Sequence, residues 1–336
     1  MPIVVSFGPD APAETAARVL ELLDIPSPED RRCRWHDSGL LVVRSDSGPL
    51  DRVRQVAGVA RAVALPDKHP LVSAEERSGV VTLPNGARIG GGAPVVIAGP
   101  CSAESESQVC EIARIVKEAG AVALRGGAFK PRTSPYAFGG LGEKGLEFLA
   151  RAREKTGLPV VTEALDTSHV DVVARYADMI QIGSRNMSNY PLLFKAGSHP
   201  SGKPILLKRG FAATIEELLM AAEYVLLGRM RAGIDEPRLI LCERGIRTFD
   251  DSLRFTLDVG AFPVLKERTR LPVLADPSHA AGARRHVPPL AMAALAAGAD
   301  GLLVEVHVDP DRAWSDAEQS LDPEGFRKMM EAVRGR

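Results

Sequence analysis

Eight short apolar runs recur from about residue 80 onward, spaced roughly thirty residues apart, which is the length of one βαβ unit. They read PVVIAGPC, AVALRGG, PVVTEAL, MIQIGSR, PILLKRG, RLILCERG, PVLADPSH and GLLVEVH, starting near residues 94, 121, 159, 179, 204, 238, 272 and 301. Most are continuous rather than alternating, as expected of parallel strands buried on both faces. Amphipathic segments such as ESQVCEIARIVKEAG and TIEELLMAAEYVLLGR fit helices between them. The repeat predicts a closed (β/α)8 barrel.

A doubly wound open sheet is the alternative fold, but it seldom needs eight equivalent units. The least regular part of the repeat is the segment 247–271, where the helical pattern is weak. Just before the barrel, VVTLPNGARIG carries an Asn-Gly turn between two strand-like pieces. This predicts a small hairpin at the bottom of a barrel domain that covers residues 80–336.

Residues 1–66 follow a different pattern. IVVSF, the two halves of CRWHDSGLLVVRS, and VARAVAL read as strands, while APAETAARVLELLD and PLDRVRQVAG read as helices. The order βαββαβ predicts a small ferredoxin-like α+β domain. The polar, turn-rich residues 67–79 form the predicted linker. Because no catalytic constellation falls in this first domain, packing and regulation are its two candidate roles.

The composition limits the classes of protein to consider. The 336 residues carry 42 Lys and Arg against 43 Asp and Glu, so no excess charge points to nucleic acid or an acidic membrane surface. The N-terminus does not read as a signal peptide, and no stretch approaches the ~20 apolar residues of a membrane-spanning helix. The four cysteines form no CxxC pair, which favours a reducing cytoplasm over a disulfide framework.

Polar or ionisable side chains follow each of the eight predicted strands. Barrel enzymes build their sites at the carboxyl ends of the strands, so these side chains are expected to surround one shared site. The strand ends are Cys101-Ser102, Arg125-Gly126-Gly127, Glu163, Ser184-Arg185-Asn186, Lys208-Arg209, Glu243-Arg244, Asp276-Ser278-His279 and Glu305-His307.

One subset of these side chains suits a metal ion. Cys101, His279 and Glu305 follow strands that are adjacent around a closed barrel, and Asp316 lies in the next segment, RAWSDAEQSL. A thiolate, an imidazole and carboxylates suit a borderline divalent ion such as Mn, Fe, Co or Zn. Taken alone, Cys101 would more often be a small buried apolar residue than a ligand, and His279 fits a core histidine as well as a ligand, so their coincidence carries the prediction. His307 shares a strand face with Glu305 and is a competing ligand.

A second subset is cationic. On a nearly neutral protein, so many cations on one face require anionic partners. Arginine binds phosphate or carboxylate through two N–H groups, and lysine supplies a point charge or a proton. Solvated surface charge is the alternative for any one cation, but their number predicts two phosphorylated substrates or one substrate with several anionic groups. The cations are Arg125, Lys130, Arg132, Arg185, Lys208, Arg209 and Arg244.

The motifs at these strand ends resemble those of the 3-deoxy-D-arabino-heptulosonate 7-phosphate (DAHP) synthase family, of the Iβ type with an N-terminal ferredoxin-like regulatory domain. The resemblance extends over essentially the whole barrel and includes IAGPCSAES, LRGGAFKPRTSPYAFGGLGEKGLE, VVTEALD, QIGSRN, LLKRGF, LCERGIRTF, DPSHAAG, GLLVEVH and SDAEQSLD. It implies a metal-dependent transferase that condenses phosphoenolpyruvate (PEP) with D-erythrose 4-phosphate to DAHP and inorganic phosphate. This reaction is the first step of the shikimate pathway to the aromatic amino acids.

The resemblance also implies a set of site residues. The divalent metal ion would be bound by Cys101, His279, Glu305 and Asp316. PEP would be held by Arg125, Lys130, Ser184, Arg185, Lys208 and Arg244. Erythrose 4-phosphate would meet the loop of Lys130, Pro131, Arg132 and Thr133, whose prolines stiffen it around an anion.

A mechanism follows from these charges as a hypothesis. The metal ion would polarise the aldehyde oxygen, and the cations would hold two anions together against their repulsion. Lys130 is the candidate proton donor to the aldehyde oxygen, and Glu163 is the candidate guide for a water molecule. Together with Cys101 and His279, these two residues form the expected catalytic set.

Two other functions compete with this one. The nearer is 3-deoxy-D-manno-octulosonate 8-phosphate synthase, which uses the same barrel and PEP with arabinose 5-phosphate. Its loop resembles Lys-Ala-Asn-Arg-Ser, whereas this chain has Lys-Pro-Arg-Thr-Ser, and it usually lacks the N-terminal domain. The other is a non-catalytic ligand sensor, which the loss of a metal or anion ligand would favour, yet every such position is filled here.

The resemblance extends to regulation and assembly. In relatives, the N-terminal domains pair between subunits and bind an aromatic amino acid as a feedback inhibitor. Here CRWHDSGLLVV is shorter than in well-matched relatives, so a domain that only joins subunits is the equal alternative. A homotetramer or homodimer in the cytoplasm, with no nucleic-acid or membrane partner, is the expected state.

Overall fold

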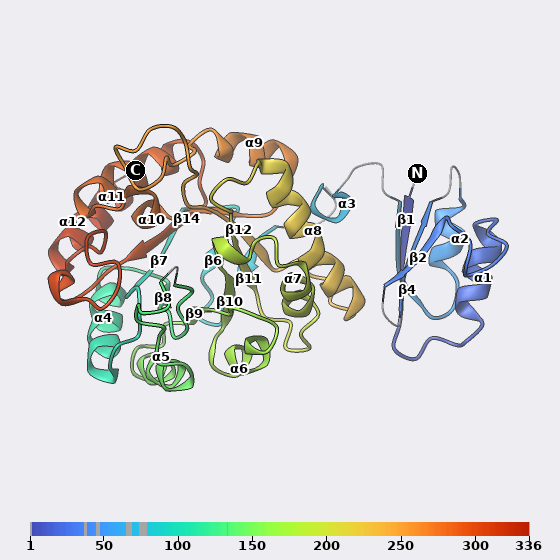
Figure 1. The fold of residues 1–336 in the computed structure, drawn as a ribbon, viewed down its shortest axis with the longest axis horizontal. Helices are drawn as coiled ribbons and strands as arrows, with labels where there is room; N and C mark the ends of the chain where they lie inside the picture. Colours follow the sequence, from blue (N-terminus) through green and yellow to red (C-terminus); the bar gives the residue numbers. More distant parts are fainter. Residues whose placement is uncertain are drawn as a thin grey trace.

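The computed structural model describes residues 2–36, 39–44, 48–64, 69–73, 79–132 and 134–335. Its larger part is a closed barrel of eight parallel strands surrounded by helices (Figure 1). A four-stranded antiparallel sheet with two helices lies beside the barrel. The predicted fold class, a (β/α)8 barrel preceded by a small ferredoxin-like domain, is therefore confirmed. Among the described residues, no helix is both long and apolar enough to cross a membrane.

The barrel strands coincide with the eight predicted apolar runs. The last strand closes the barrel by pairing in parallel with the first, which places Gly301 opposite Val95 and Glu305 opposite Gly99. The strands are buried along their length because helices cover their outer face and side chains fill the interior. They are β7 (Val95–Gly99), β8 (Ala123–Arg125), β9 (Val160–Glu163), β10 (Met179–Ile182), β11 (Ile205–Lys208), β12 (Leu239–Glu243), β13 (Val273–Ala275) and β14 (Gly301–Glu305).

The surrounding helices turn an apolar face toward the barrel. In α4, for example, Val109, Ile112 and Val116 are buried at helical spacing. Helix α8 begins with a capping box formed by Thr214 and Glu217, which satisfies two N–H groups of its first turn. The helices are α4 (Glu106–Glu118), α5 (Glu143–Thr156), α6 (His169–Tyr176), α7 (Tyr190–Gly197), α8 (Ile215–Arg231), α9 (Ala261–Arg268), α10 (Pro277–Ala281), α11 (Val287–Ala296) and α12 (Pro323–Arg334).

A hairpin fills the amino-terminal end of the barrel. Strands β5 (Val81–Thr82) and β6 (Arg88–Ile89) pair antiparallel around the Asn-Gly turn, as the sequence predicted. Val81, Leu83 and Ile89 pack against inward-facing strand residues such as Ile97 and Leu206. This end of the barrel is therefore a packed apolar core, and the opposite end is left for polar side chains.

The N-terminal sheet has the βαββαβ connection expected from the sequence, with strand order β2-β3-β1-β4. One face packs against the two helices through Val5, Val19, Leu20, Leu41 and Val43. The elements are β1 (Pro2–Phe7), α1 (Thr15–Leu22), β2 (Cys33–His36), β3 (Leu40–Arg44), α2 (Leu50–Arg54) and β4 (Val59–Ala64).

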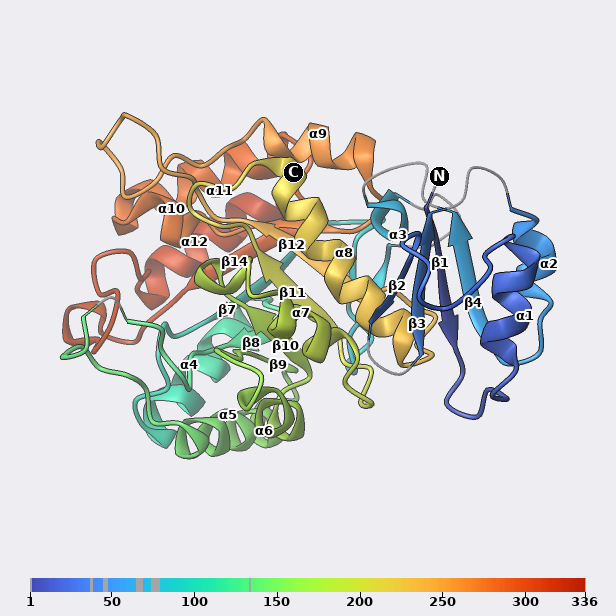
Figure 2. The same cartoon turned by 45° about the vertical axis from the view of Figure 1, so that its right-hand side comes forward.

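The other face of this sheet is turned toward the barrel (Figure 2). Val4 and Leu40 belong to the same buried cluster as Leu71 and Val72 of helix α3 (Pro70–Ser73), which contacts α8. The Glu223 carboxylate of α8 accepts hydrogen bonds from the Leu71 and Val72 N–H groups at 3.1 and 3.0 Å. Helix α3 falls within the predicted linker 67–79, of which 67–68 and 74–78 lie outside the described residues. The domain boundaries at 66 and 79 stay a prediction.

Candidate active site

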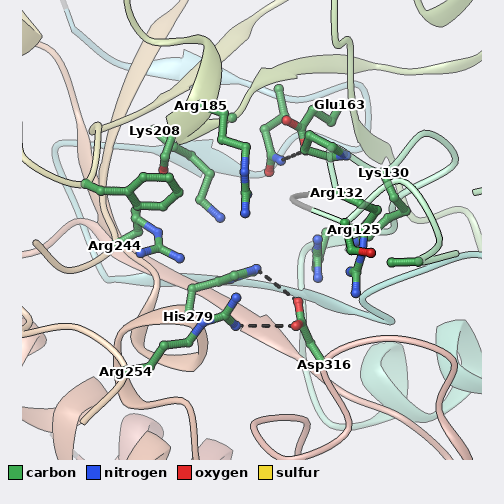
Figure 3. A pocket seen from close by; sticks show the side chains of 17 residues that line it. Arg125, Lys130, Arg132, Glu163, Arg185, Lys208, Arg244, Arg254, His279 and Asp316 are labelled. Atoms are coloured by element: carbon green, nitrogen blue, oxygen red, sulfur yellow. Dashed lines mark hydrogen bonds and ion pairs between the residues drawn. The ribbon is translucent and has the colours of Figure 1, made fainter. Parts of the chain in front are cut away.

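A cavity of about 310 Å³ lies at the carboxyl ends of the barrel strands (Figure 3). It is lined by residues that follow or end seven different strands, so segments far apart in the sequence meet there. Its positively charged lining consists of Arg125, Lys130, Arg132, Arg185, Lys208, Arg244 and Arg254. The predicted site residues Pro131, Glu163, Ser184, His279 and Asp316 also line it. Thr133 lies outside the described residues.

The four predicted metal ligands lie together below one side of this cavity. Ligand atoms of Cys101, Glu305 and Asp316 are within 4.8 Å of one another. His279 lies at the edge of this group, with Nε2 3.4 Å from Glu305 Oε1 and 3.8 Å from Asp316 Oδ2. The thiol of Cys101 donates to the same Asp316 oxygen at 3.2 Å. One sulfur, one imidazole nitrogen and two carboxylates at this spacing fit a borderline divalent ion.

Asp276 holds the His279 ring in the orientation that this site needs. As the N-cap of α10, it accepts the His279 backbone N–H at 2.9 Å, and its other oxygen lies 2.7 Å from Nδ1. With Nδ1–H donating to Asp276, Nε2 is left facing Glu305 and Asp316. Although burial alone would raise the pKa of Asp276, His279 and Lys208 hold this pKa well below its usual range. The sequence placed both residues at one strand end but did not indicate that they contact each other.

Lys130 connects the thiol to the cationic wall. Its Nζ donates to Cys101 Sγ at 2.8 Å and to the Cys101 carbonyl at 2.9 Å. Burial raises the pKa of the Cys101 thiol to about 12; Glu305 adds to this effect and Lys130 opposes it. Burial alone would lower the pKa of Lys130, but Cys101 and Glu305 raise it. Lys130 is therefore positively charged at neutral pH and carries a proton for transfer.

Several cations of the site are already paired with carboxylates. Arg125 donates to Glu305 Oε1 at 2.6 Å, and both side chains are buried. Lys208 forms a buried ion pair with Asp276. These pairs compensate the burial of charge and attach the cationic wall of the cavity to the two carboxylates that contact His279.

Arg209 is not available to a substrate, contrary to the prediction. Its guanidinium turns away from the cavity and donates to Glu243 Oε2 at 2.9 Å and to Asp258 Oδ2 at 2.7 Å. It is almost completely buried between these carboxylates, and it does not line the cavity. The anionic partners of Arg209 are therefore carboxylates of the protein itself: Glu243 at the end of β12 and Asp258 in the long loop that follows.

His307 does not compete for the metal site either. Its Nδ1 lies 2.7 Å from the Asp309 carbonyl, and its Nε2 lies 3.5 Å from Glu104 Oε2. Glu104 also accepts the Trp314 N–H at 2.8 Å. His307 therefore belongs to a buried polar contact that fastens the segment leading to Asp316.

Sequence reasoning missed three residues of the site. Arg254 lines the cavity and donates to Gln319 Oε1 at 2.6 Å and to Asp316 Oδ1 at 3.3 Å. Gln319 in turn donates from Nε2 to Glu305 Oε2 at 2.5 Å, so one buried amide joins a cation of the cavity to a carboxylate of the candidate metal site. Phe211 lines the cavity beside the arginines. Arg254 lies in the irregular segment 247–271, where no strand end pointed to the cavity.

Glu163 is a carboxylate enclosed by cations. Its Oε2 accepts from Gln181 Nε2 at 3.3 Å, and its buried Oε1 has no hydrogen-bond partner among the described residues. Burial raises the pKa of Glu163, although Lys130, Lys208, Arg125 and Arg185 act to lower it. A carboxyl whose pKa is higher in the folded than in the unfolded chain destabilises the fold once pH rises above the unfolded value.

Glu163→Gln is therefore expected to increase the free energy of unfolding at pH 8. This gain should shrink as pH falls toward 4.5, the pKa of an unperturbed Glu, and vanish below it, where the wild-type carboxyl is protonated in both states. Denaturant titration of both proteins across this pH range measures it. Glu147→Gln, at an exposed position of α5, is the matched control. A gain in the free energy of unfolding that does not depend on pH would show that burial of the Glu163 charge is not its cause.

A closed (β/α)8 barrel whose cation-lined cavity adjoins a thiol, imidazole and carboxylate cluster defines a barrel enzyme for anionic substrates. Comparison with known proteins then identifies the family. The sequence model of the DAHP synthetase I family matches residues 73–335, and the chain belongs to this family.

Individual relatives agree with this assignment. A phospho-2-dehydro-3-deoxyheptonate aldolase of Thermotoga maritima is 52% identical over 247 residues, which are 74% of this chain and 71% of the relative. The crystal structure of the phospho-2-dehydro-3-deoxyheptonate aldolase (DAHP synthase) from Thermotoga maritima matches with a TM-score of 0.76 and 42% identity, covering 99% of this chain and 96% of that one. A 2-dehydro-3-deoxyphosphooctonate aldolase of Syntrophotalea carbinolica is more distant, at 34% identity over 73% of this chain and 91% of the relative.

Proposed function

We propose that the protein condenses PEP with D-erythrose 4-phosphate and water to give DAHP and inorganic phosphate, the first step of aromatic amino acid biosynthesis. The observation that carries this proposal is the meeting of seven cavity cations with the Cys101, Glu305 and Asp316 cluster at one end of the barrel. Membership of the DAHP synthetase I family supports it. The cations would bind two phosphorylated substrates, and their charge would offset the repulsion between them.

The chemistry divides among the residues as follows. Cys101, His279, Glu305 and Asp316 would hold a divalent ion (Mn, Fe, Co or Zn), which as a Lewis acid supplies polarisation of the aldehyde oxygen. Lys130 lies beside this set and gives its proton to the aldehyde oxygen as the new C–C bond forms from the enol carbon of PEP.

The remaining steps occur at the phosphate-bearing carbon of PEP, which becomes electron-deficient once its neighbour has formed the new bond. A water molecule adds there and loses a proton to Glu163, which faces the cavity among the cations. The bond between this carbon and the phosphate oxygen then breaks. Inorganic phosphate leaves with the electron pair and takes up the proton of the remaining hydroxyl, which becomes the ketone.

The binding roles are divided between two parts of the cavity wall. Arg125, Lys130, Ser184, Arg185, Lys208 and Arg244 are assigned to PEP. Lys130, Pro131, Arg132 and Thr133, which follow β8 in the sequence, are assigned to the erythrose phosphate, with Arg132 and Thr133 at its phosphate end. Arg132 is exposed at the cavity rim, where the second substrate would arrive.

The N-terminal sheet supports a proposal on assembly and regulation. Its outer strands, β2 and β4, present edges to which a second copy could pair, in keeping with a homodimer or homotetramer. Val4 and Leu40 attach this sheet to α8 of the barrel. An aromatic amino acid bound to the N-terminal domain would act on the barrel through this contact. A cytoplasmic location belongs to the same proposal, and it agrees with four cysteines that are all free thiols.

A direct comparison of two aldoses tests the proposed reaction. With PEP, a divalent metal ion and erythrose 4-phosphate, the protein is expected to release phosphate in equal amount to the heptulosonate formed. With arabinose 5-phosphate, turnover should be at least about a hundredfold slower, because the loop after β8 carries Pro131 and Arg132. Preference for arabinose 5-phosphate would favour the octulosonate alternative, and ligand binding without phosphate release would favour the sensor.

A further inference from the structure

Arg244 differs from the other buried cations at the strand ends. Arg125, Lys208 and Arg209 each form an ion pair with a buried carboxylate. Arg244 is only 3% exposed, yet it forms no ion pair with any described residue, and its Nη1 has no hydrogen-bond partner there. An isolated buried charge is costly, so some other group must stabilise this guanidinium.

Two phenylalanine rings lie beside Arg244, where a carboxylate counterion would otherwise be expected. The Arg244 guanidinium carbon lies 4.2 Å from the centre of the Phe255 ring and 4.9 Å from that of Phe211. The two rings are themselves stacked, with centres 5.1 Å apart and planes 10° apart. Both distances are within the roughly 6 Å at which a cation is attracted to the face of an aromatic ring. Arg185 also lies 5.2 Å from the centre of the Phe211 ring.

Backbone hydrogen bonds hold the two chain segments that carry these rings. The Arg247 N–H donates to the Phe211 carbonyl at 2.6 Å, and the Phe255 N–H donates to the Ala280 carbonyl at 2.9 Å. Gly245 has a φ of +91°, and a Cβ there would lie 2.6 Å from the Cβ of Phe255. The glycine directly after Arg244 therefore allows the close approach of the Phe255 segment.

We propose that Phe211 and Phe255 are positioning residues that act in place of a counterion for Arg244 and keep this guanidinium available to an anionic group of PEP. The inference rests on the proposed function and extends it to the cation assigned to PEP. A carboxylate partner would compete with the substrate for the N–H groups of Arg244. A ring face offers electrostatic attraction without occupying those N–H groups, so they remain able to bind a carboxylate or phosphate.

The other charges around Arg244 agree with this role. Burial lowers the pKa of the Arg244 guanidinium to about 10, with Asp276 opposing and Arg254 adding to the effect. Asp276 is already engaged by Lys208 and His279, so its carboxylate is not free to pair with Arg244. The guanidinium therefore stays charged at neutral pH with its N–H groups unfilled, and the two rings are the groups that lie beside it.

The test measures PEP affinity in variants of Phe255. Calorimetric titration of PEP alone into the full-length, metal-loaded protein is expected to give about tenfold weaker binding for Phe255→Leu. The KM for PEP should rise by a similar factor, with little change in kcat at saturating PEP, because Lys130 and the metal site are untouched. Phe255→Tyr should retain near-normal affinity, since its ring face is kept. Phe249→Leu makes the same change on an exposed ring of the same loop and should bind PEP like the wild type.

Replacing Phe255 with mono-, di- and trifluorophenylalanine separates electrostatics from packing. Fluorine withdraws charge from the ring face with little change in size, so PEP affinity should fall stepwise with each fluorine. Equal affinity across the fluorinated series, or unchanged binding in Phe255→Leu, would overturn the inference. Failure of the proposed function would look different, because the wild type itself would then neither bind PEP nor release phosphate.

Discussion

Cys101→Ala is expected to lower phosphate release from PEP and erythrose 4-phosphate by at least a hundredfold. Loss of a residue that merely supports a metal ligand costs about 10- to 100-fold in metal affinity or activity, and loss of a ligand should cost more. The thiol lies 3.2 Å from Asp316 Oδ2 and 2.8 Å from Lys130 Nζ, so its removal also takes away one of the two hydrogen-bond acceptors of the lysine and leaves only the backbone carbonyl.

Two measurements separate these effects. The metal content after dialysis, together with the dissociation constant for Mn or Co, reports on ligation without any turnover. Steady-state phosphate release, with and without a chelator, reports on the reaction. Cys242→Ala is the matched control, because Cys242 is equally buried but packs in the apolar interior of the barrel. Full activity of Cys101→Ala that a chelator does not reduce would remove the metal ion from the proposed mechanism.

Arg209→Met should destabilise the fold by about 3–5 kcal/mol, the usual cost of leaving a buried carboxylate without its partner. Here Glu243 would lose its partner at 2.9 Å, and Asp258 would lose its own at 2.7 Å. Through Arg209, which directly follows β11, these two contacts link the end of β12 and the loop after it to the end of β11. Denaturant unfolding of the wild type and the variant measures the difference.

The choice of controls makes this prediction specific. Arg151 pairs with Glu154 on the exposed face of α5, and Arg151→Met should leave the free energy of unfolding nearly unchanged. The double variant Arg209→Met/Glu243→Gln should recover part of the loss, because one unpaired charge is removed. If Arg209 bound substrate instead, its replacement would weaken PEP binding and leave stability unaltered.

The barrel and most of its cavity could be predicted from sequence because two independent patterns coincide. Continuous apolar runs indicate strands buried on both faces, and closure of the barrel then brings the strand ends together. Cys101 and His279, which are far apart in the sequence, both reach Asp316 Oδ2 for this reason. The family motifs contain these same residues.

The rest of the site depends on contacts that have no local pattern. Charge and strand position placed Arg209 in the cavity, but whether a cation is free depends on carboxylates from other elements, and Asp258 lies 49 residues away. Arg254 was not predicted as a site residue because the apolar residues around it follow neither a helical nor a strand period. Gln319 is an uncharged amide, and only its two hydrogen bonds reveal that it joins Arg254 to Glu305.

The apolar hairpin at the amino-terminal end of the barrel determines the route by which ligands reach the cavity. Because Val81, Leu83 and Ile89 fill that end, ligands have to enter and depart past the loops at the opposite end. A molecule held by the inner cations would then have to arrive before one held at Arg132 on the rim, and would be the later of the two to escape. The cavity would therefore open at one end only, and the depth of each binding position would set the order in which the two substrates bind.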